Sequence, residues 1–97
     1  MASLKEMLLA EQKKLENYLQ KSLQQLQDAP MGTLRVSYSN QCAQYYHVIP
    51  GGKKNGTYIP REKEELVRRL AQKGYDEKFV RLAERRLAQI RRIYEGL

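Results

Sequence analysis

The side chains that could do specific chemistry are gathered in one stretch, Met31 to Pro60. It holds four of the seven tyrosines, the one cysteine, Cys42, and the one histidine, His47. A cysteine and a histidine can form a nucleophile–base pair, but these two lie five residues apart on one expected strand and so point to opposite faces. One histidine without an acidic cluster is also a poor metal site. We therefore expect no catalytic residue, no metal and no cofactor, with His47 structural and Cys42 incidental.

Two further kinds of site are not indicated. The glycine-rich loop GGKKNG lacks the spacing of a phosphate-cradling loop. A single cysteine allows neither an internal disulfide nor a cysteine-based zinc cluster. We expect a protein that is not an enzyme and that has no small-molecule substrate.

Positive charge is concentrated in the second half of the chain. Eighteen Lys and Arg against 11 Asp and Glu give a formal net charge of +7. Residues 1–52 carry five basic and four acidic side chains, a net of +1, and residues 53–97 carry 13 and seven, a net of +6. A basic half attracts polyanions by its long-range field and by counterion release. DNA or RNA is therefore the expected partner, and a solvated, salt-bridged surface is the alternative.

Four basic side chains share one face of the expected last helix. They are spaced by three, four and seven residues, at Lys78, Arg81, Arg85 and Arg92. Phosphate contact favours arginine, whose planar fork binds two oxygens at once. We expect the three arginines to contact phosphates. In the alternative interpretation they are neutralised by acids of the same helix, Glu77, Glu84 and Glu95.

Helical segments flank the tyrosine-rich stretch. Ser3 followed by Glu6 is a capping box, and the leucines that follow recur at three- and four-residue steps, which predicts a helix to about Gln27. After Pro60, which suits a helix start, Lys73-Gly74 has the pattern of a C-cap and Asp76 that of an N-cap. We therefore expect a short helix, a break, and a long last helix to about Glu95, packed antiparallel on the first.

The middle segment is expected to be a β-hairpin. Residues 33–38 and 43–49 are the strands, Ser39-Asn40-Gln41 has turn chemistry, and residues 57–59 are candidates for a short third strand. Parity places one set of side chains on the core face: Leu34, Val36, Tyr38, Ala43, Tyr45, His47 and Ile49. The other set is expected to face solvent: Arg35, Ser37, Gln44, Tyr46 and Val48.

The solvent face of this hairpin is the second candidate contact surface. Arg35 and Tyr46 are expected to lie across the strands from each other, as a cation over an aromatic ring. The same pair can stack on a base or contact a backbone, and Lys53 and Lys54 add charge from the adjoining loop. Ordinary surface packing is the alternative.

The core is expected to be thin. The chain has no tryptophan and one phenylalanine, so part of its apolar surface is expected to meet another chain or domain. No apolar run approaches 18 residues, and acids interrupt the short apolar patch at the N-terminus. We expect a cytoplasmic protein with no membrane contact.

Several runs carry a family resemblance: GTLRVSYSN, QYYH, GTYIP and ELVRRLAQKGYDEKFVRLAERRL. Together they resemble the N-terminal region of uncharacterised Firmicutes proteins, over about residues 31–95. In longer members a restriction-endonuclease-like nuclease domain follows this region. This chain reaches Leu97 without an acid–lysine nuclease motif, so no catalytic residue is carried over. The resemblance implies a fragment or short relative, a nucleic-acid-facing module without the cutting machinery.

A weaker likeness concerns the sheet. Two or three strands rich in Tyr, Arg and Lys, followed by a helix, are similar to the arm-type DNA-binding domains of phage integrases. Those domains read DNA with the sheet, and the long preceding helix does not fit that pattern. The likeness supports the hairpin surface only.

These observations predict one small α+β domain, with a helix at 1–28, a β element at 31–60 and a helical pair at 61–97. The leading hypothesis is a non-catalytic, basic nucleic-acid-binding or accessory module of a mobile-element or nuclease-associated protein. Its contacts would be made by Arg35, Tyr46, Lys53, Lys54, Arg81, Arg85 and Arg92. The alternative is a protein–protein interaction module, either a helical hairpin that forms homodimers or a small phage-type inhibitor protein.

Overall fold

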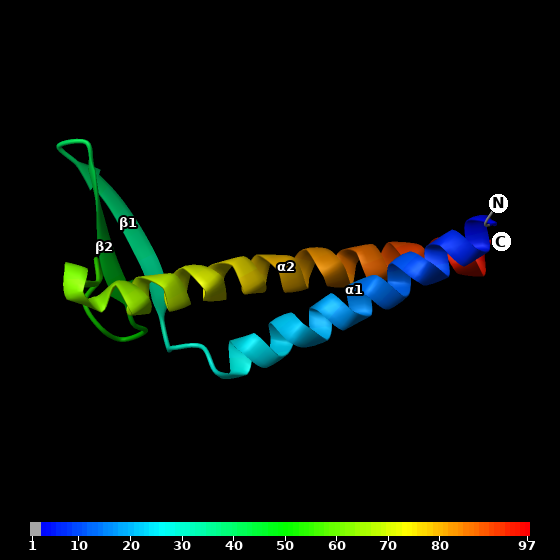
Figure 1. Ribbon diagram of the computed structural model, residues 1–97, viewed down its shortest axis with the longest axis horizontal. Helices are drawn as coiled ribbons and strands as arrows, with labels where there is room; N and C mark the ends of the chain where they lie inside the picture. The colour runs from blue at the N-terminus through cyan, green and yellow to red at the C-terminus, as the bar shows by residue number, and fades with distance from the viewer. Residues whose placement is uncertain (1–2) are drawn as a thin grey trace. The chain divides into compact units, whose positions relative to one another are not determined.

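The computed structural model describes residues 3–97 and has the expected α+β architecture (Figure 1). The elements in chain order are α1 (Leu4–Gln27), β1 (Thr33–Ser39), β2 (Cys42–Val48), β3 (Thr57–Tyr58), a 3-10 turn (Arg61–Lys63) and α2 (Glu64–Glu95). The strands form one antiparallel sheet in the order β1-β2-β3. The predicted long first helix, hairpin with a short third strand, and long last helix are confirmed.

The chain divides into two compact units. The helical unit combines the chain up to Gln27 with Asp76–Leu97, and the sheet unit is Asp28–Tyr75. Helix α2 contributes its first turns to the sheet unit and the rest to the helical unit. The interpretation of the chain as a single domain stays a prediction.

The helical unit is an antiparallel pair with a narrow seam. The Ser3 hydroxyl accepts a hydrogen bond from the Glu6 backbone N–H at 3.1 Å, which confirms the predicted cap. Contacts between the helices show their direction: the Lys5 ammonium lies 5.2 Å from the centre of the Tyr94 ring, and Glu11 pairs with Arg86. Residue numbers rise along α1 as they fall along α2, so the predicted antiparallel packing is confirmed. The buried side chains of this seam are Leu8, Ser22, Asp76, Ala83 and Ile90.

The predicted break at Lys73-Gly74 is wrong, because α2 runs without interruption from Glu64 to Glu95. A glycine inside a helix costs only about 1 kcal/mol relative to alanine, and contacts on both sides of Gly74 oppose a break. In the sheet unit, the Lys73 ammonium donates to the carbonyl of Pro30 at 3.0 Å and to that of Gly32 at 2.7 Å.

On the other side of Gly74, Asp76 is a seam residue and not a helix cap. It is 2% exposed. In the helical unit, the Gln25 side-chain amide lies against its carboxylate and, with the nitrogen turned toward it, donates to Oδ2 at 3.0 Å and to Oδ1 at 3.3 Å. A buried carboxylate needs such donors, because an unsatisfied one is costly.

The hairpin in the sheet unit has the shortest loop that joins two antiparallel strands. Ser39 pairs with Cys42, so Asn40 and Gln41 form a two-residue turn, with φ of 51° and 64°. Positive φ at both positions is the twist that suits such a turn. The register then confirms the predicted division of side chains, because Leu34 pairs with His47, Val36 with Tyr45, and Tyr38 with Ala43.

The expected burial of the two faces is only partly correct, because the five residues expected to face solvent are all half-buried: Arg35, Ser37, Gln44, Tyr46 and Val48. On the expected core face the agreement is also incomplete. Tyr38 is 78% exposed, and Val36, Ala43 and Ile49 are exposed as well. The buried residues of the sheet unit are Gly32, Ile59 and Leu70. Its core therefore lies where the chain enters β1 and leaves β3, and the strands extend past it toward the turn.

His47 has a structural role at this base of the hairpin. Its Nε2 lies 2.7 Å from the Met31 carbonyl and is in place to donate to it. Gly32 has a φ of +93°, and a Cβ there would lie 2.5 Å from the Val48 carbonyl and 2.9 Å from the His47 ring. The ring fits because residue 32 has no side chain.

Candidate nucleic-acid interface

Arg35 and Tyr46 meet as predicted, directly opposite each other on β1 and β2. The guanidinium carbon of Arg35 lies 4.2 Å from the centre of the Tyr46 ring, the geometry of a cation–π contact. The Nε–H of Arg35 also donates to the Asn55 carbonyl at 2.8 Å. Arg35 therefore ties the loop between β2 and β3 to the sheet.

Lys53 and Lys54 lie in this tied loop, and both are exposed. The Gly56 N–H donates to the Lys53 carbonyl at 3.0 Å, which closes a tight turn directly before Thr57. Neither ammonium group has a hydrogen bond or ion pair among residues 3–97. Both charges are therefore free to meet an anion, and Arg35 limits the freedom of the loop that carries them.

Tyr58 was not among the contact residues predicted from the sequence, but it lies on the same surface of the sheet unit as Tyr46. It pairs with Tyr46 across β2 and β3, and the two rings make an edge-to-face contact with centres 5.8 Å apart. Tyr46 is half-buried and its hydroxyl donates to the Gln44 side chain at 3.2 Å, whereas Tyr58 is 54% exposed. Pairing the predicted third strand with β2 would have placed Tyr58 beside Tyr46.

In the helical unit, the four cations predicted to share a face do so on one continuous helix. We call Lys78, Arg81, Arg85 and Arg92 the basic row. Arg81 and Arg85 each lie two residues from buried Ala83, and Arg92 lies two residues from buried Ile90. Two residues correspond to about 200° around a helix, so the row lies opposite the seam. All four side chains are exposed.

The basic row is not neutralised by the acids of its own helix. Among residues 3–97, the ion pairs are Arg68 with Glu64, and Arg86 with Glu11. The alternative interpretation expected the row to be paired within α2, and no such pair is present in this part of the chain. The row therefore presents four cations to solvent.

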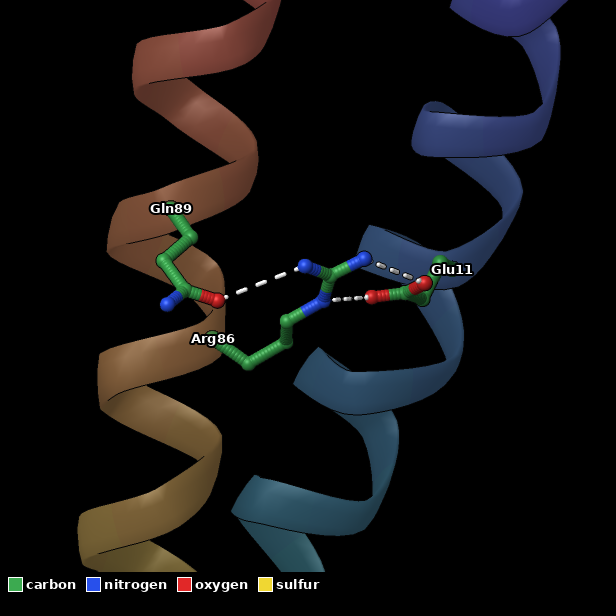
Figure 2. Close-up of polar contacts among 3 residues, drawn as sticks. All are labelled: Glu11, Arg86 and Gln89. Atoms are coloured by element: carbon green, nitrogen blue, oxygen red, sulfur yellow. Dashed lines mark hydrogen bonds and ion pairs between the residues drawn. The ribbon is translucent and has the colours of Figure 1, made fainter.

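Arg86, in contrast to the basic row, is already occupied (Figure 2). Its Nε and Nη2 groups both donate to the Glu11 carboxylate, the latter at 3.0 Å, and its Nη1 donates to the Gln89 side chain at 3.3 Å. Hydrogen bonding to Arg86 lowers the pKa of Glu11, and the same bond raises the pKa of Arg86. Nothing in the sequence joins two residues 75 positions apart, so this pair could not be predicted.

The sheet unit also has an open groove of about 590 Å³ beside β2. One wall is β2 from Cys42 to Tyr45, and the other is the chain leaving β3 together with the start of α2. Arg68 lines it but is held by Glu64 at 3.1 Å.

Two classes of site are not found in the part of the chain that is described. Within residues 3–97, no three His, Cys, Asp or Glu side chains come together where they could hold a metal ion. No helix of that part is long and apolar enough to cross a membrane.

The predicted contact residues therefore form two sets, one in each unit. Arg35, Tyr46, Lys53 and Lys54 come together in the sheet unit, and the arginines of the basic row align in the helical unit. Comparison of the chain with protein-family models, curated proteins and solved structures gives no match.

Proposed function

We propose that the protein is a non-catalytic nucleic-acid-binding module whose basic row contacts backbone phosphates. The supporting observation is the row itself: four exposed cations on the side of α2 opposite the seam, with no acidic partner among residues 3–97. An arrangement that keeps like charges exposed and unpaired costs stability through repulsion, and a polyanion relieves that repulsion. Counterion release then favours binding.

The length of the basic row suits a nucleic-acid backbone. From Lys78 to Arg92 the row covers 14 helical steps, about 21 Å. The major groove of B-DNA is about 12 Å wide, so the row is long enough to reach phosphates on both of its walls. Arginine at three of the four positions adds the bidentate geometry that a phosphate accepts.

The sheet unit offers a second, aromatic contact. In the proposed complex, Lys53 and Lys54 bind phosphates and the exposed ring of Tyr58 stacks on a base. Arg35 and Tyr46 support this surface from beneath through their mutual contact and the Arg35–Asn55 hydrogen bond. Such a surface binds without reading a sequence, because every base has a π-face.

The proposal extends to the setting of the protein. We place it in the cytoplasm, as an accessory module of a mobile-element or nuclease-associated protein that holds nucleic acid while another domain acts on it. A module of that kind needs affinity and no catalytic group of its own.

The test uses fluorescence anisotropy with a labelled DNA duplex and a single-stranded RNA of equal length. In the double variant Arg81→Glu/Arg85→Glu we expect affinity to fall by at least about tenfold, because two phosphate contacts become repulsive. Lys13→Glu/Lys21→Glu is the control, since it makes the same change in net charge at two exposed positions of α1. We expect at most about a twofold loss for the control.

Two outcomes would contradict the proposal. Equal losses in the two double variants would show that net charge alone drives binding, and that the basic row is no site. Absence of binding to both nucleic acids by the unaltered protein would remove the function altogether.

A further inference from the structure

Apolar side chains line one open side of the helical unit. On α1, Leu4, Met7 and Tyr18 lie seven residues before, four before and seven after Glu11. Residues at these spacings share a helix face, so all three lie on the side where Glu11 reaches Arg86. On α2, Leu82 and Ile93 lie four before and seven after Arg86 and share its side in the same way. We call these five apolar residues, with the Glu11–Arg86 pair, the open face.

The open face presents five large apolar side chains to solvent, all of them exposed. The helical unit buries Leu8, Ala83 and Ile90, and further apolar residues such as Leu15, Leu19 and Leu87 are half-buried. Two helices form a single layer, and stable domains cover the apolar side of a layer with a second one. Helices in proteins draw most of their stability from such packing.

We propose that a second copy of this chain covers the open face, so that two helical pairs form a four-helix dimer. The area is sufficient. Two helices about 30 Å long present a face about 20 Å wide, or about 600 Å² per copy. Stable interfaces bury about 1,200 to 2,000 Å² in total, so this face meets the lower end of that range.

The charges on the open face are self-complementary. Its centre is the Glu11–Arg86 pair, which is neutral as a whole although the chain carries +7. A two-fold axis that lies in the interface, parallel to the helices, sets α1 of one copy over α2 of the other. Glu11 of each copy then lies near Arg86 of the other, so opposite charges meet. An acidic partner protein would instead be drawn to the basic row, where the unpaired cations are.

The apolar residues also match under the same two-fold axis. The Lys5–Tyr94 contact places the start of α1 beside the end of α2, so Leu4, Met7 and Ile93 lie at one end of the face. Tyr18 and Leu82 lie at the other end. The axis sets each end over the same end of the other copy, apolar on apolar. A shallow hollow of about 400 Å³, lined by Arg86, Gln89, Arg92 and Ile93, lies at the end that Leu4 and Met7 of the second copy cover.

The dimer has a consequence for the basic row. Arg81 and Arg85 lie outside the open face, so each copy keeps these cations exposed. Two linked rows bind a polyanion more tightly than one, because the second contact is made within the complex. This consequence rests on the proposed function, but the dimer itself does not.

The first experiment measures mass by sedimentation equilibrium without nucleic acid. We expect the unaltered chain to have twice its monomer mass. Met7→Lys and Leu9→Lys form a matched pair, since the two residues are neighbours on α1 that are 59% and 46% exposed. Only Met7 lies on the open face. We expect Met7→Lys to raise the dimer dissociation constant by at least about tenfold. The ammonium of the new lysine would either be desolvated in the interface or keep the two copies from packing closely. Leu9→Lys leaves the dissociation constant unchanged.

A second experiment tests the two-fold axis directly and needs no destabilised variant. In a Cys42→Ser background, which removes the free exposed cysteine, a Tyr18→Cys chain and a Leu82→Cys chain are mixed, because the axis sets these two positions of different copies at the same end of the face. A disulfide between the two chains should form on mild oxidation, whereas Tyr18→Cys mixed with Ala88→Cys, whose cysteine points away from the open face, should not crosslink. A monomeric unaltered chain, equal effects of the two lysine variants, or equal crosslinking of Tyr18→Cys to positions 82 and 88 would each overturn the proposal.

Discussion

At the residue scale, Arg35 has two roles. It is a predicted contact residue, and it also holds together the surface on which the other contact residues lie. Its guanidinium lies over Tyr46 while its Nε–H holds the Asn55 carbonyl. These contacts occupy one face of the guanidinium and its Nε–H donor. They fix the position of the loop that carries Lys53 and Lys54. Arg35 therefore acts mainly through the lysines that it positions.

This role predicts that Arg35→Ala frees the loop. Trypsin cleaves after lysine, and a loop that is held on the sheet resists it, so cleavage after Lys53 and Lys54 should become faster by at least about fivefold. The global free energy of unfolding should fall by about 1 kcal/mol, the usual value for one hydrogen bond and one exposed cation–π contact. Limited proteolysis read by mass spectrometry measures the first effect.

Tyr46→Phe is the matched control for this prediction. It removes the hydroxyl that bonds Gln44 but keeps the ring under Arg35. Cleavage in the loop should stay at its original rate. Unchanged cleavage in Arg35→Ala as well would show that the loop is held by something other than Arg35.

At the element scale, α2 shows where a local pattern and the packing disagree. Lys73-Gly74 followed by Asp76 has the pattern of one helix ending and another beginning. The contacts that override it join residues far apart in the chain: Lys73 with Pro30 and Gly32, and Asp76 with Gln25. No local rule contains such partners.

Continuity of α2 predicts that Gly74→Ala stabilises the protein. Gly74 is helical and a Cβ there meets no atom within 4 Å. Alanine lowers the entropy of the unfolded chain, so the free energy of unfolding should rise by about 0.4–1 kcal/mol in urea denaturation. Gly32→Ala, with its φ of +93°, is the opposite case and should be clearly destabilising. A loss of stability in Gly74→Ala would mean that the helix does break there.

The Glu11–Arg86 pair between the two helices predicts a pH dependence. The hydrogen bond from Arg86 lowers the pKa of Glu11 from the ordinary value of 4.5, so the folded state favours the ionised carboxylate. This contribution is complete above 4.5 and is lost as the pH falls through the folded-state pKa. The stability difference between the unaltered protein and Glu11→Gln should therefore be largest at neutral pH and vanish in acid.

Urea denaturation of both proteins across this pH range measures the difference. Half-exposed side chains are screened by salt, so the effect should also shrink at high ionic strength. A difference that is constant with pH would show that the pair does not distinguish the ionised from the neutral carboxyl.

How much the sequence could predict differs between elements for physical reasons. The sheet faces followed from parity, because a two-residue turn leaves one register. Exposure of Tyr38 did not follow, because alternation tells which face a side chain is on and not whether another element covers it. The basic row followed from helical spacing alone, whereas Tyr58 needed the pairing of β3 with β2.

At the scale of the whole molecule, the positive charge and the exposed apolar side chains lie on different surfaces. The +6 carried by residues 53–97 supplies the sheet-unit loop and the basic row, while one basic residue of α2, Arg86, is used between the helices. The open face is neutral at its centre and apolar at its ends. Nucleic acid and a second copy are thus assigned to different surfaces, and neither assignment depends on the other.

The salt dependence of DNA affinity is the most direct measurement of whether the basic row binds phosphates. If four phosphates are neutralised by the basic row, the logarithm of the association constant should fall with the logarithm of salt concentration with a slope of about −3.6 or steeper. In Arg81→Glu/Arg85→Glu the slope should become shallower by about 1.8, since two contacts are lost. A slope near zero, or an identical slope in the two proteins, would contradict the claim that this row is where the protein meets nucleic acid.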